Sequence, residues 1–254
     1  MPEQPLKPTG AESVKPYADS ERDKGGQVEE MFDSIAPAYD LMNTAMTFGM
    51  HRIWRRRALR RVAGALCGKV LDVATGTGDL AFFLRRHYGS RSITGIDLSA
   101  GMLAVARRKL AMLPEPDRNA ISFMEADCLA LPFADNSFDA VTVAYGVRNF
   151  ERLLQGIREM QRVLRPGGSI CIIELSEPRM PHLRMMYRLY ARHVIPAVGR
   201  MVSGDCSAYT YLPMSIAAAP QREAMTKLMR QAGLRDTAWR TMTFGSVCVY
   251  TAVK

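Results

Sequence analysis

The chain has 254 residues, of which 48% are hydrophobic and 23% are charged, as in an ordinary globular protein. The length predicts one large domain or one domain with appendages, and the composition excludes a disordered or fibrous chain. The net charge of +9 suits nucleic acid, an anionic lipid surface or an acidic substrate. Five scattered cysteines without a CxxC pair and a beginning without a signal-peptide pattern predict buried, reduced thiols in a cytoplasmic protein.

The first quarter of the chain predicts a tail followed by helices. Residues 1–26 are rich in Pro, Lys, Glu, Ser and Gly and predict a disordered tail. A helical pattern over Val28–Ile35 ends before Pro37, and Ala38–Met50 reads as irregular. A second helix is predicted over His51–Leu66, with six arginines, so Arg55–Arg61 is either a solvated face or a docking patch.

From Lys69 onward, strands alternate with helices, which predicts a parallel sheet covered on both faces. The predicted strands are Val70–Ala74, Ser92–Ile96, Ile121–Glu125, Ala140–Ala144, Ser169–Glu174, Leu234–Thr241 and Val247–Ala252. The predicted helices are Asp79–His87, Ala100–Leu113, Arg152–Leu164 and Gln221–Gln231. Arg165–Gly168 predicts a turn, and a Met- and Arg-rich helical insert follows Glu177.

A glycine loop joins the first of these strands to its helix. Gly76 and Gly78 let the backbone approach a ligand where a Cβ atom would clash, and the helix from Asp79 presents free N–H groups. Asp97 follows at the end of the second strand, where a carboxylate binds ribose hydroxyls. This pattern predicts an adenosine cofactor.

Two adenosine cofactors fit the loop. Gly76-x-Gly78-x-x-Ala81 also matches a dinucleotide fingerprint. Asp72, four residues before Gly76, favours S-adenosylmethionine, because a carboxylate there either orders the loop or reaches the ammonium group of the ligand. A turn without a ligand would leave Asp72, Asp79 and Asp97 together without a cationic partner.

The third and fourth strands add residues to the same edge of the sheet. Asp127 follows the third strand and is expected to accept a hydrogen bond from the adenine amino group, with the Cys128 backbone near the ring. Ligands of open α/β sheets bind at the carboxyl ends of the strands. We therefore expect Asp97, Asp127 and Ala144 to lie together there.

Several longer blocks occur in a fixed order from about Val28 to the end of the chain. The blocks are Phe32-x-x-Ile35-Ala36-x-x-Tyr39-Asp40-x-Met42-Asn43, Gly49-x-His51-Arg52-x-Trp54-Arg55-Arg56, Ala74–Asp79, Leu131–Asp139, Tyr145-Gly146-Val147-Arg148-Asn149 and Val163–Gly168. In this order they resemble the menaquinone and ubiquinone biosynthesis C-methyltransferases. The first block and the Gly-Val-Arg-Asn segment are the specific ones, because many methyltransferases share the glycine loop.

The resemblance implies an α/β fold of the class I, Rossmann-like methyltransferase type, with a seven-stranded, mostly parallel sheet whose last strand is antiparallel. It implies one methyltransferase domain over 27–254, with a helical lid at 27–66 and a substrate or membrane insert at 176–219. The implied reaction methylates a ring carbon of demethylmenaquinol to give menaquinol, the last step of menaquinone biosynthesis. S-adenosyl-L-methionine would become S-adenosyl-L-homocysteine, without a metal. Methylation of a ubiquinone precursor and, more remotely, of RNA are the alternatives.

The resemblance also assigns roles to residues. Thr77, Asp97, Asp127 and Cys128 fall on cofactor positions of the family, and Ala144 stands where some members have serine. With Asp72, Gly76 and Gly78 they form the expected cofactor site.

The expected catalytic residues are Arg148, Asn149 and Tyr39. Arg148 would stabilise the phenolate, Asn149 would orient the ring, and Tyr39 would bind the second hydroxyl from the lid. The competing interpretation of Arg148 is a salt bridge to Glu151, and His51 is read as a structural residue rather than a base.

The segment Pro181–Ile195 is expected to contact the lipid that carries the substrate. Arg184, Arg188 and Arg192 recur on one helical face, and no acidic residue occurs from Arg179 to Gly204. The apolar surface of this segment is expected to come from Leu183, Met186, Tyr187, Tyr190 and Val194. The pattern suits an anionic membrane surface at the inner face of the membrane. A core-facing helix and a homodimer interface are the alternatives, and no nucleic-acid partner is expected.

Overall fold

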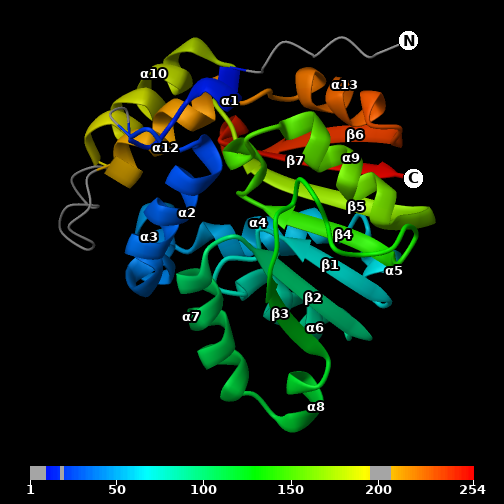
Figure 1. The fold of residues 1–254 in the computed structure, drawn as a ribbon. Coiled ribbons are helices and arrows are strands. Elements are labelled where there is room, and N and C mark those ends of the chain that lie inside the picture. Colours follow the sequence, from blue (N-terminus) through cyan, green and yellow to red (C-terminus); the bar gives the residue numbers. More distant parts are fainter. Residues whose placement is uncertain (1–9, 18–19, 195–206) are drawn as a thin grey trace.

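The computed structural model describes residues 10–17, 20–194 and 207–254, which fold around one seven-stranded sheet with the order β3-β2-β1-β4-β5-β7-β6 (Figure 1). The strands are β1 Lys69–Val73, β2 Ser92–Asp97, β3 Ile121–Glu125, β4 Phe138–Ala144, β5 Leu164–Leu175, β6 Arg235–Met242 and β7 Val247–Val253. Strands β1 to β5 pair in parallel, whereas β7 is antiparallel to β5 and β6. The predicted sheet with an antiparallel last strand is confirmed.

The largest difference from the predicted strands lies at β5, which begins at Leu164 instead of Ser169. The turn predicted for residues 165–168 pairs with the end of the chain. Gly167 N donates to Lys254 O at 3.0 Å, and Lys254 N donates to Gly168 O at 3.0 Å. Because these bonds satisfy the backbone, the segment stays in the sheet despite its glycines.

Helices follow the strands close to the predicted positions. They are α6 Asp79–Tyr88, α7 Ala100–Ala111, α8 Glu115–Arg118, α9 Leu153–Val163 and α13 Glu223–Gln231. The first turn of α7 is capped by Ser99, whose hydroxyl accepts from Met102 N at 3.0 Å. Gly89 ends α6 in the left-handed conformation, with φ at 60°.

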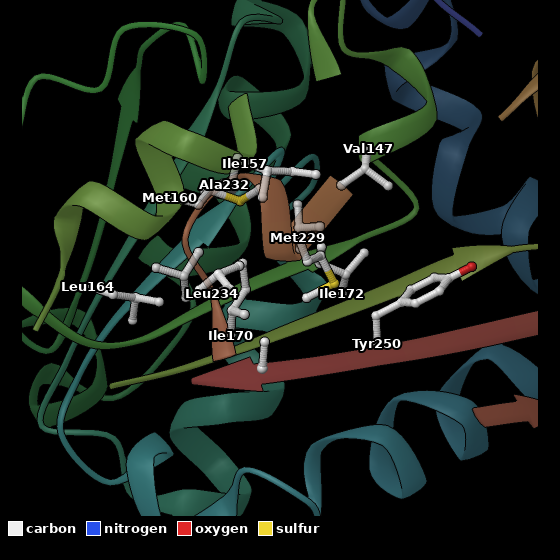
Figure 2. Close-up of a cluster of buried hydrophobic side chains, with 14 of the residues drawn as sticks. Val147, Ile157, Met160, Leu164, Ile170, Ile172, Met229, Ala232, Leu234 and Tyr250 are labelled. Atoms are coloured by element: carbon white, nitrogen blue, oxygen red, sulfur yellow. The ribbon is translucent and has the colours of Figure 1, made fainter. Parts of the chain in front are cut away.

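Two cores lie on the two faces of the sheet, because neighbouring residues of a strand point to opposite sides. Leu71 belongs to the core beneath α9 and α13, and Val70 belongs to the core on the opposite face. Figure 2 shows part of the first core, where Ile157 and Met160 of α9 meet Ile170 and Ile172 of β5. This packing fixes the strand ends that carry the site.

The helices before β1 depart from the predicted tail and lid boundaries. They are α1 Gly10–Ser13, α2 Lys24–Ile35, the 3₁₀ turn η1 Ala36–Ala38, α3 Tyr39–Thr47, α4 Met50–Leu59 and α5 Ala63–Leu66. The prediction of an irregular 38–50 was wrong, since α3 occupies most of it, and the predicted helix 51–66 is two helices. Helices α2 and α3 share a third core with part of the insert.

Part of the predicted tail is packed. Ala11 is buried, and Lys24 Nζ, also buried, donates to Ala11 O at 2.7 Å, Arg148 O at 3.2 Å and Phe150 O at 3.3 Å. Burial lowers the pKa of Lys24 to about 8. The prediction of a disordered tail was therefore wrong for residues 10–17 and 20–26, because contacts with the rest of the fold hold them in place. Residues 1–9 and 18–19 lie outside the described residues.

The insert forms α10 Pro181–Leu189, the π-helical turn η3 Tyr190–Val194 and α12 Ser207–Ala218, and its residues 195–206 lie outside the described part. Of the five cysteines predicted to be buried, Cys171 and Cys248 are buried, Cys128 is half-buried and Cys67 is exposed, while Cys206 lies outside the described residues. Within the described ranges, no helix has the length and apolarity needed to cross a bilayer.

Candidate active site

Two adjoining cavities lie at the carboxyl ends of β1, β2 and β4. The smaller has a volume of about 110 Å³ and the larger about 330 Å³. The larger one is walled mainly by apolar side chains of α2, α3, α4, α10 and α12. Both cavities are lined by Phe32, Tyr39, Ala74, Gly76, Ala144 and Tyr145. This shared wall places a ligand of one cavity beside a ligand of the other.

The glycine loop has the backbone that its sequence requires. Gly76 and Gly78 have φ values of 56° and 79°, in the region that favours glycine. A Cβ atom on Gly78 would lie 2.7 Å from Phe123 Cζ, although Gly78 itself lines neither cavity. Asp72 accepts hydrogen bonds from Thr75 Oγ1 at 2.6 Å and from Thr142 Oγ1 at 2.8 Å. Asp72 therefore ties Thr75 of the loop to Thr142 of β4, and it also lines the larger cavity.

The smaller cavity carries the carboxylates predicted for adenosine. Asp97 accepts from Gly76 N at 2.7 Å and from Ser99 N at 3.0 Å. Burial raises the pKa of Asp97, against these backbone hydrogen bonds, which lower it. Asp127 accepts from Leu129 N at 2.8 Å. Because a carboxylate has about four acceptor positions, both acids keep acceptor capacity for a ligand.

Two further residues predicted for the cofactor site line the smaller cavity. Cys128 and Ala144 line the smaller cavity beside Asp97 and Asp127, as expected from the strand ends. Burial raises the pKa of the Cys128 thiol. A neutral thiol and a methyl group give this part of the cavity an apolar surface, which suits the face of an adenine ring.

A chain of charges joins the lid to the glycine loop. Thr77 Oγ1 donates to Asp40 Oδ1 at 2.6 Å, and Asp40 pairs with Lys109 of α7. Lys109 Nζ also lies 2.9 Å from Asp79 Oδ1, and Arg55 Nη2 lies 3.4 Å from Asp79 Oδ2. Although burial acts to raise the pKa of Asp79, Lys109 lowers it below its usual value. The expectation that Asp79 lacks a cationic partner was wrong, because its partners are distant in sequence.

Arg148 lies in a buried ion pair at the edge of the larger cavity. Its Nη1 donates to Glu174 Oε1 at 2.7 Å and also to Tyr145 O, and its backbone N donates to Glu174 Oε2 at 3.2 Å. The two side chains are only 7% and 3% exposed. Although burial acts to lower the pKa of Arg148, the charge of Glu174 holds it above its usual value. The predicted pairing with Glu151 is replaced by one with Glu174 of β5.

The ion pair with Glu174 leaves one hydrogen-bond donor of the Arg148 guanidinium without an acceptor in the described part of the fold. Its Nε atom is buried and has no hydrogen-bond partner among the described residues, and the residue lines the larger cavity. A buried donor without a partner is costly by about 1–3 kcal/mol. The arrangement therefore supplies a fixed cation with spare donor capacity beside an apolar cavity.

The other two predicted catalytic residues, Tyr39 and Asn149, and the predicted structural residue His51 lie in different places. Tyr39 lines both cavities, and burial raises the pKa of its hydroxyl. Asn149 lines only the smaller cavity, where its Oδ1 accepts from Tyr211 OH at 3.1 Å. His51 Nδ1 lies 2.8 Å from Thr47 Oγ1, and burial and then Arg55 lower its pKa. His51 thus has the hydrogen-bonded position that was expected of a structural residue.

Two features of the site were not found from the sequence. Glu174 lies in a strand far along the chain from Arg148, and no local spacing connects them. Tyr145 belongs to a recognised block, yet a sequence pattern reveals neither its positive φ of 61° nor the burial of its hydroxyl.

The family model described as the ubiE/COQ5 methyltransferase family matches residues 18–254. A demethylmenaquinone methyltransferase of Porphyromonas gingivalis is 48% identical over 244 residues, which cover 96% of this chain and 98% of the relative. Another protein of that name, from Deinococcus radiodurans, is 45% identical over 92% of this chain and 95% of its own.

Solved structures share the fold at much lower identity. A Thermotoga maritima structure described as a SAM-dependent methyltransferase, possible histamine N-methyltransferase, superposes with a TM-score of 0.60 at 16% identity. The match covers 89% of this chain and 99% of that one. The glycine loop, the acidic strand ends and the full-length match agree, and the chain belongs to the ubiE/COQ5 methyltransferase family.

Proposed function

We propose that the chain transfers the methyl group of S-adenosyl-L-methionine to a ring carbon of demethylmenaquinol, giving menaquinol. The observation that carries the proposal is an apolar cavity holding a buried arginine, Arg148, next to a second cavity lined by Asp97 and Asp127. The names of the relatives support the quinol as acceptor.

The cofactor would be held from the carboxyl ends of β1 to β4. Asp97 would accept from the ribose hydroxyls and Asp127 from the adenine amino group, with Cys128 and Ala144 against the ring. The loop at Gly76 would bring its backbone to the ligand. When bound, S-adenosyl-L-methionine supplies an electrophilic methyl group.

Arg148 would make the ring carbon nucleophilic. A hydroquinone carbon gains electron density when the neighbouring hydroxyl loses its proton, and phenols have pKa values near 10. A buried guanidinium beside that oxygen stabilises the phenolate, because charge interactions are strong away from water. Glu174 holds the guanidinium at 2.7 Å without occupying Nε. Arg148 therefore acts as the oxyanion-stabilising group.

Tyr39 and Asn149 would position the reactants. Tyr39 lies in the wall between the cavities and would hydrogen-bond a quinol hydroxyl from the lid side. Asn149 would act from the cofactor side, since it lines the smaller cavity only. Holding the two reacting atoms at about 3–3.5 Å supplies much of the remaining acceleration.

The test is methyl transfer from labelled S-adenosyl-L-methionine to chemically reduced demethylmenaquinol in detergent, with wild type, Arg148→Ala and Arg86→Ala. Arg86 is exposed and lines neither cavity, so it is the matched control. We expect Arg148→Ala to lose about 100- to 1000-fold in kcat/KM, with unchanged affinity for S-adenosyl-L-homocysteine. If Arg148→Ala stays fully active, its assigned role is wrong; if wild type binds cofactor without methylating the quinol, the substrate is wrong.

We also infer that the mouth of the larger cavity docks on the inner face of an anionic membrane, where the prenyl tail of the substrate resides. The mouth surface consists of Phe48, Ile53, Met186 and Phe244, which are 85%, 49%, 63% and 81% exposed. Phe48 lines the larger cavity, and the other three each adjoin a lining residue in the chain. Exposed apolar patches of this kind mark interaction sites.

The predicted basic helix contributes to this surface differently from its sequence pattern. Tyr187 and Tyr190 face the larger cavity, and Tyr190 OH donates to Met46 O at 2.7 Å. Arg188 pairs with Glu177, 2.9 Å away. Exposed Met186 and its helix neighbours Met185 and Leu189 are left to meet lipid. The two tyrosines, Tyr187 of α10 and Tyr190 of η3, thus line the cavity. From the described residues of this segment, only Met185, Met186 and Leu189 would add to the mouth surface.

Sedimentation with vesicles tests the docking proposal. Wild type should bind phosphatidylglycerol vesicles more tightly than phosphatidylcholine vesicles, and less at high salt. Phe48→Ser should weaken binding at least tenfold, whereas Met112→Ser, 84% exposed just after α7 and away from the mouth, should not. Equal effects of the two substitutions contradict the proposal.

A further inference from the structure

Tyr145 lies where β4 leaves the sheet and enters the site. Its backbone has a φ of 61°, a conformation that is rare and strained for a bulky residue. Two contacts hold it there: Tyr145 N donates to Ile173 O at 2.7 Å, and Tyr145 O accepts from Arg148. A strained backbone conformation persists only where the surrounding structure enforces it. The fold therefore fixes the direction in which the Tyr145 side chain points.

The hydroxyl group of Tyr145 is left without an internal acceptor. It is buried and has no hydrogen-bond partner within residues 10–17, 20–194 and 207–254. The ring lines both cavities and packs on the core that contains Trp54. Burial raises the pKa of Tyr145 above its ordinary range, so the group stays a neutral donor. A buried donor without an acceptor is costly unless a ligand supplies one.

The charged groups around this hydroxyl point to the acceptor. Arg55, Glu174 and Arg148 act on it electrostatically. Glu174 is paired with Arg148, and the two arginines line only the larger cavity. Arg55 Nε is itself buried without a hydrogen-bond partner in the described part of the chain. The acids that line the larger cavity are already held by ion pairs or hydrogen bonds: Asp40 and Asp79 pair with Lys109, and Asp72 accepts from Thr75 and Thr142. Asp97 and Asp127 line only the smaller cavity. The environment therefore suits an oxygen that carries negative charge in the larger cavity.

We propose that Tyr145 is a substrate-binding residue whose hydroxyl donates a hydrogen bond to a ring oxygen of the quinol, with Arg55 as the neighbouring cation. The inference rests on the proposed function, which supplies the quinol. The bond strengthens as the ring oxygen becomes a phenolate, because hydrogen bonds to charged acceptors are stronger than neutral ones. Tyr145 thus assists Arg148 through a separate donor.

Tyr145→Phe tests this assignment, because it removes one oxygen atom and keeps the ring. Folding should be unimpaired, since the hydroxyl has no partner in the described structure. Affinity for S-adenosyl-L-homocysteine should stay within about twofold, and kcat/KM for demethylmenaquinol should fall about 10- to 100-fold. The pH at which kcat reaches half its maximum should rise by about one unit, because the bound phenolate loses a donor. Tyr88→Phe, at a residue lining neither cavity, is the control.

Several outcomes overturn the proposal. Unchanged kcat/KM and an unchanged pH profile would show that Tyr145 does not touch the reacting ring. Weakened S-adenosyl-L-homocysteine binding with an unchanged KM for the quinol would assign the hydroxyl to the cofactor instead. A wild-type enzyme that fails to methylate demethylmenaquinol defeats the proposed function as well, whereas an active wild type with a fully active Tyr145→Phe defeats only the present inference.

Discussion

The buried pair of Arg148 and Glu174 yields a prediction about stability that can be worked out from the structure. We consider Arg148→Met, Glu174→Gln and the double variant. Each single change leaves one charge buried at 7% or 3% exposure without its partner. Breaking such a pair costs about 3–5 kcal/mol, because the remaining charge is desolvated. For a domain of this size that corresponds to a fall in Tm of about 6–20 °C.

The double variant should be more stable than the sum of the single costs implies. It leaves no charge of this pair buried, and the amide introduced by Glu174→Gln keeps an acceptor for the backbone N–H groups that Glu174 binds, including that of Leu175 at 2.9 Å. We expect a coupling free energy of at least about 2 kcal/mol between the two positions.

Urea unfolding followed by circular dichroism, without cofactor, measures the four free energies of unfolding. The slopes of the four unfolding curves should agree, so that the cycle compares equally compact states. Methyl transfer should be lost in both variants that lack Arg148 and reduced in Glu174→Gln, where the guanidinium is no longer anchored. If the two single costs add to within about 0.5 kcal/mol, the pair is not coupled and the reasoning fails.

Three more predictions concern the loop, the lid and the N-terminal segment. Gly78→Ala should destabilise the fold by about 1–3 kcal/mol in thermal unfolding and weaken cofactor binding, since φ is 79° and the new Cβ would lie 2.7 Å from Phe123. Thr77→Val, which removes the 2.6 Å bond to Asp40, should raise the KM for the quinol more than it weakens cofactor binding in calorimetry; the reverse order would contradict this role. The pKa of Lys24 is lowered to about 8, so above that pH the unfolded chain holds a proton that the folded chain has released, and stability rises with pH. Between about pH 8 and 9.5 the free energy of unfolding should gain about 2 kcal/mol relative to Lys24→Met, and parallel curves would refute the shift.

The sheet could be predicted because its strands are short apolar runs set between glycine and proline signals. The carboxyl ends of parallel strands necessarily meet at one edge, which is why Asp97, Asp127 and Ala144 were expected together and line one cavity. The burial of these strands leaves little freedom for alternative registers.

What the sequence did not reveal depends on contacts between distant segments. Helix α3 has a weak apolar pattern of its own and is held by Asp40 against Thr77. Lys24 reads as an exposed charge until three carbonyl groups surround it. Glu174 was missed as the partner of Arg148 because the register of β5 against β4, rather than any spacing, brings the two together.

The antiparallel direction of β7 has a practical consequence for attaching the protein to a surface. Val253 pairs with Ser169 in the first half of β5, and Lys254 N donates to Gly168 O, so the strand ends on the side of the sheet opposite to the two cavities (Figure 1). Gly10, in contrast, lies against Ala218 of the insert. A label or sensor-chip tether fused after Lys254 would therefore leave the cavity mouth pointing outward, ready for vesicles to be flowed across it. An attachment near Gly10 would crowd the insert, and binding measured that way would be lower for steric reasons alone.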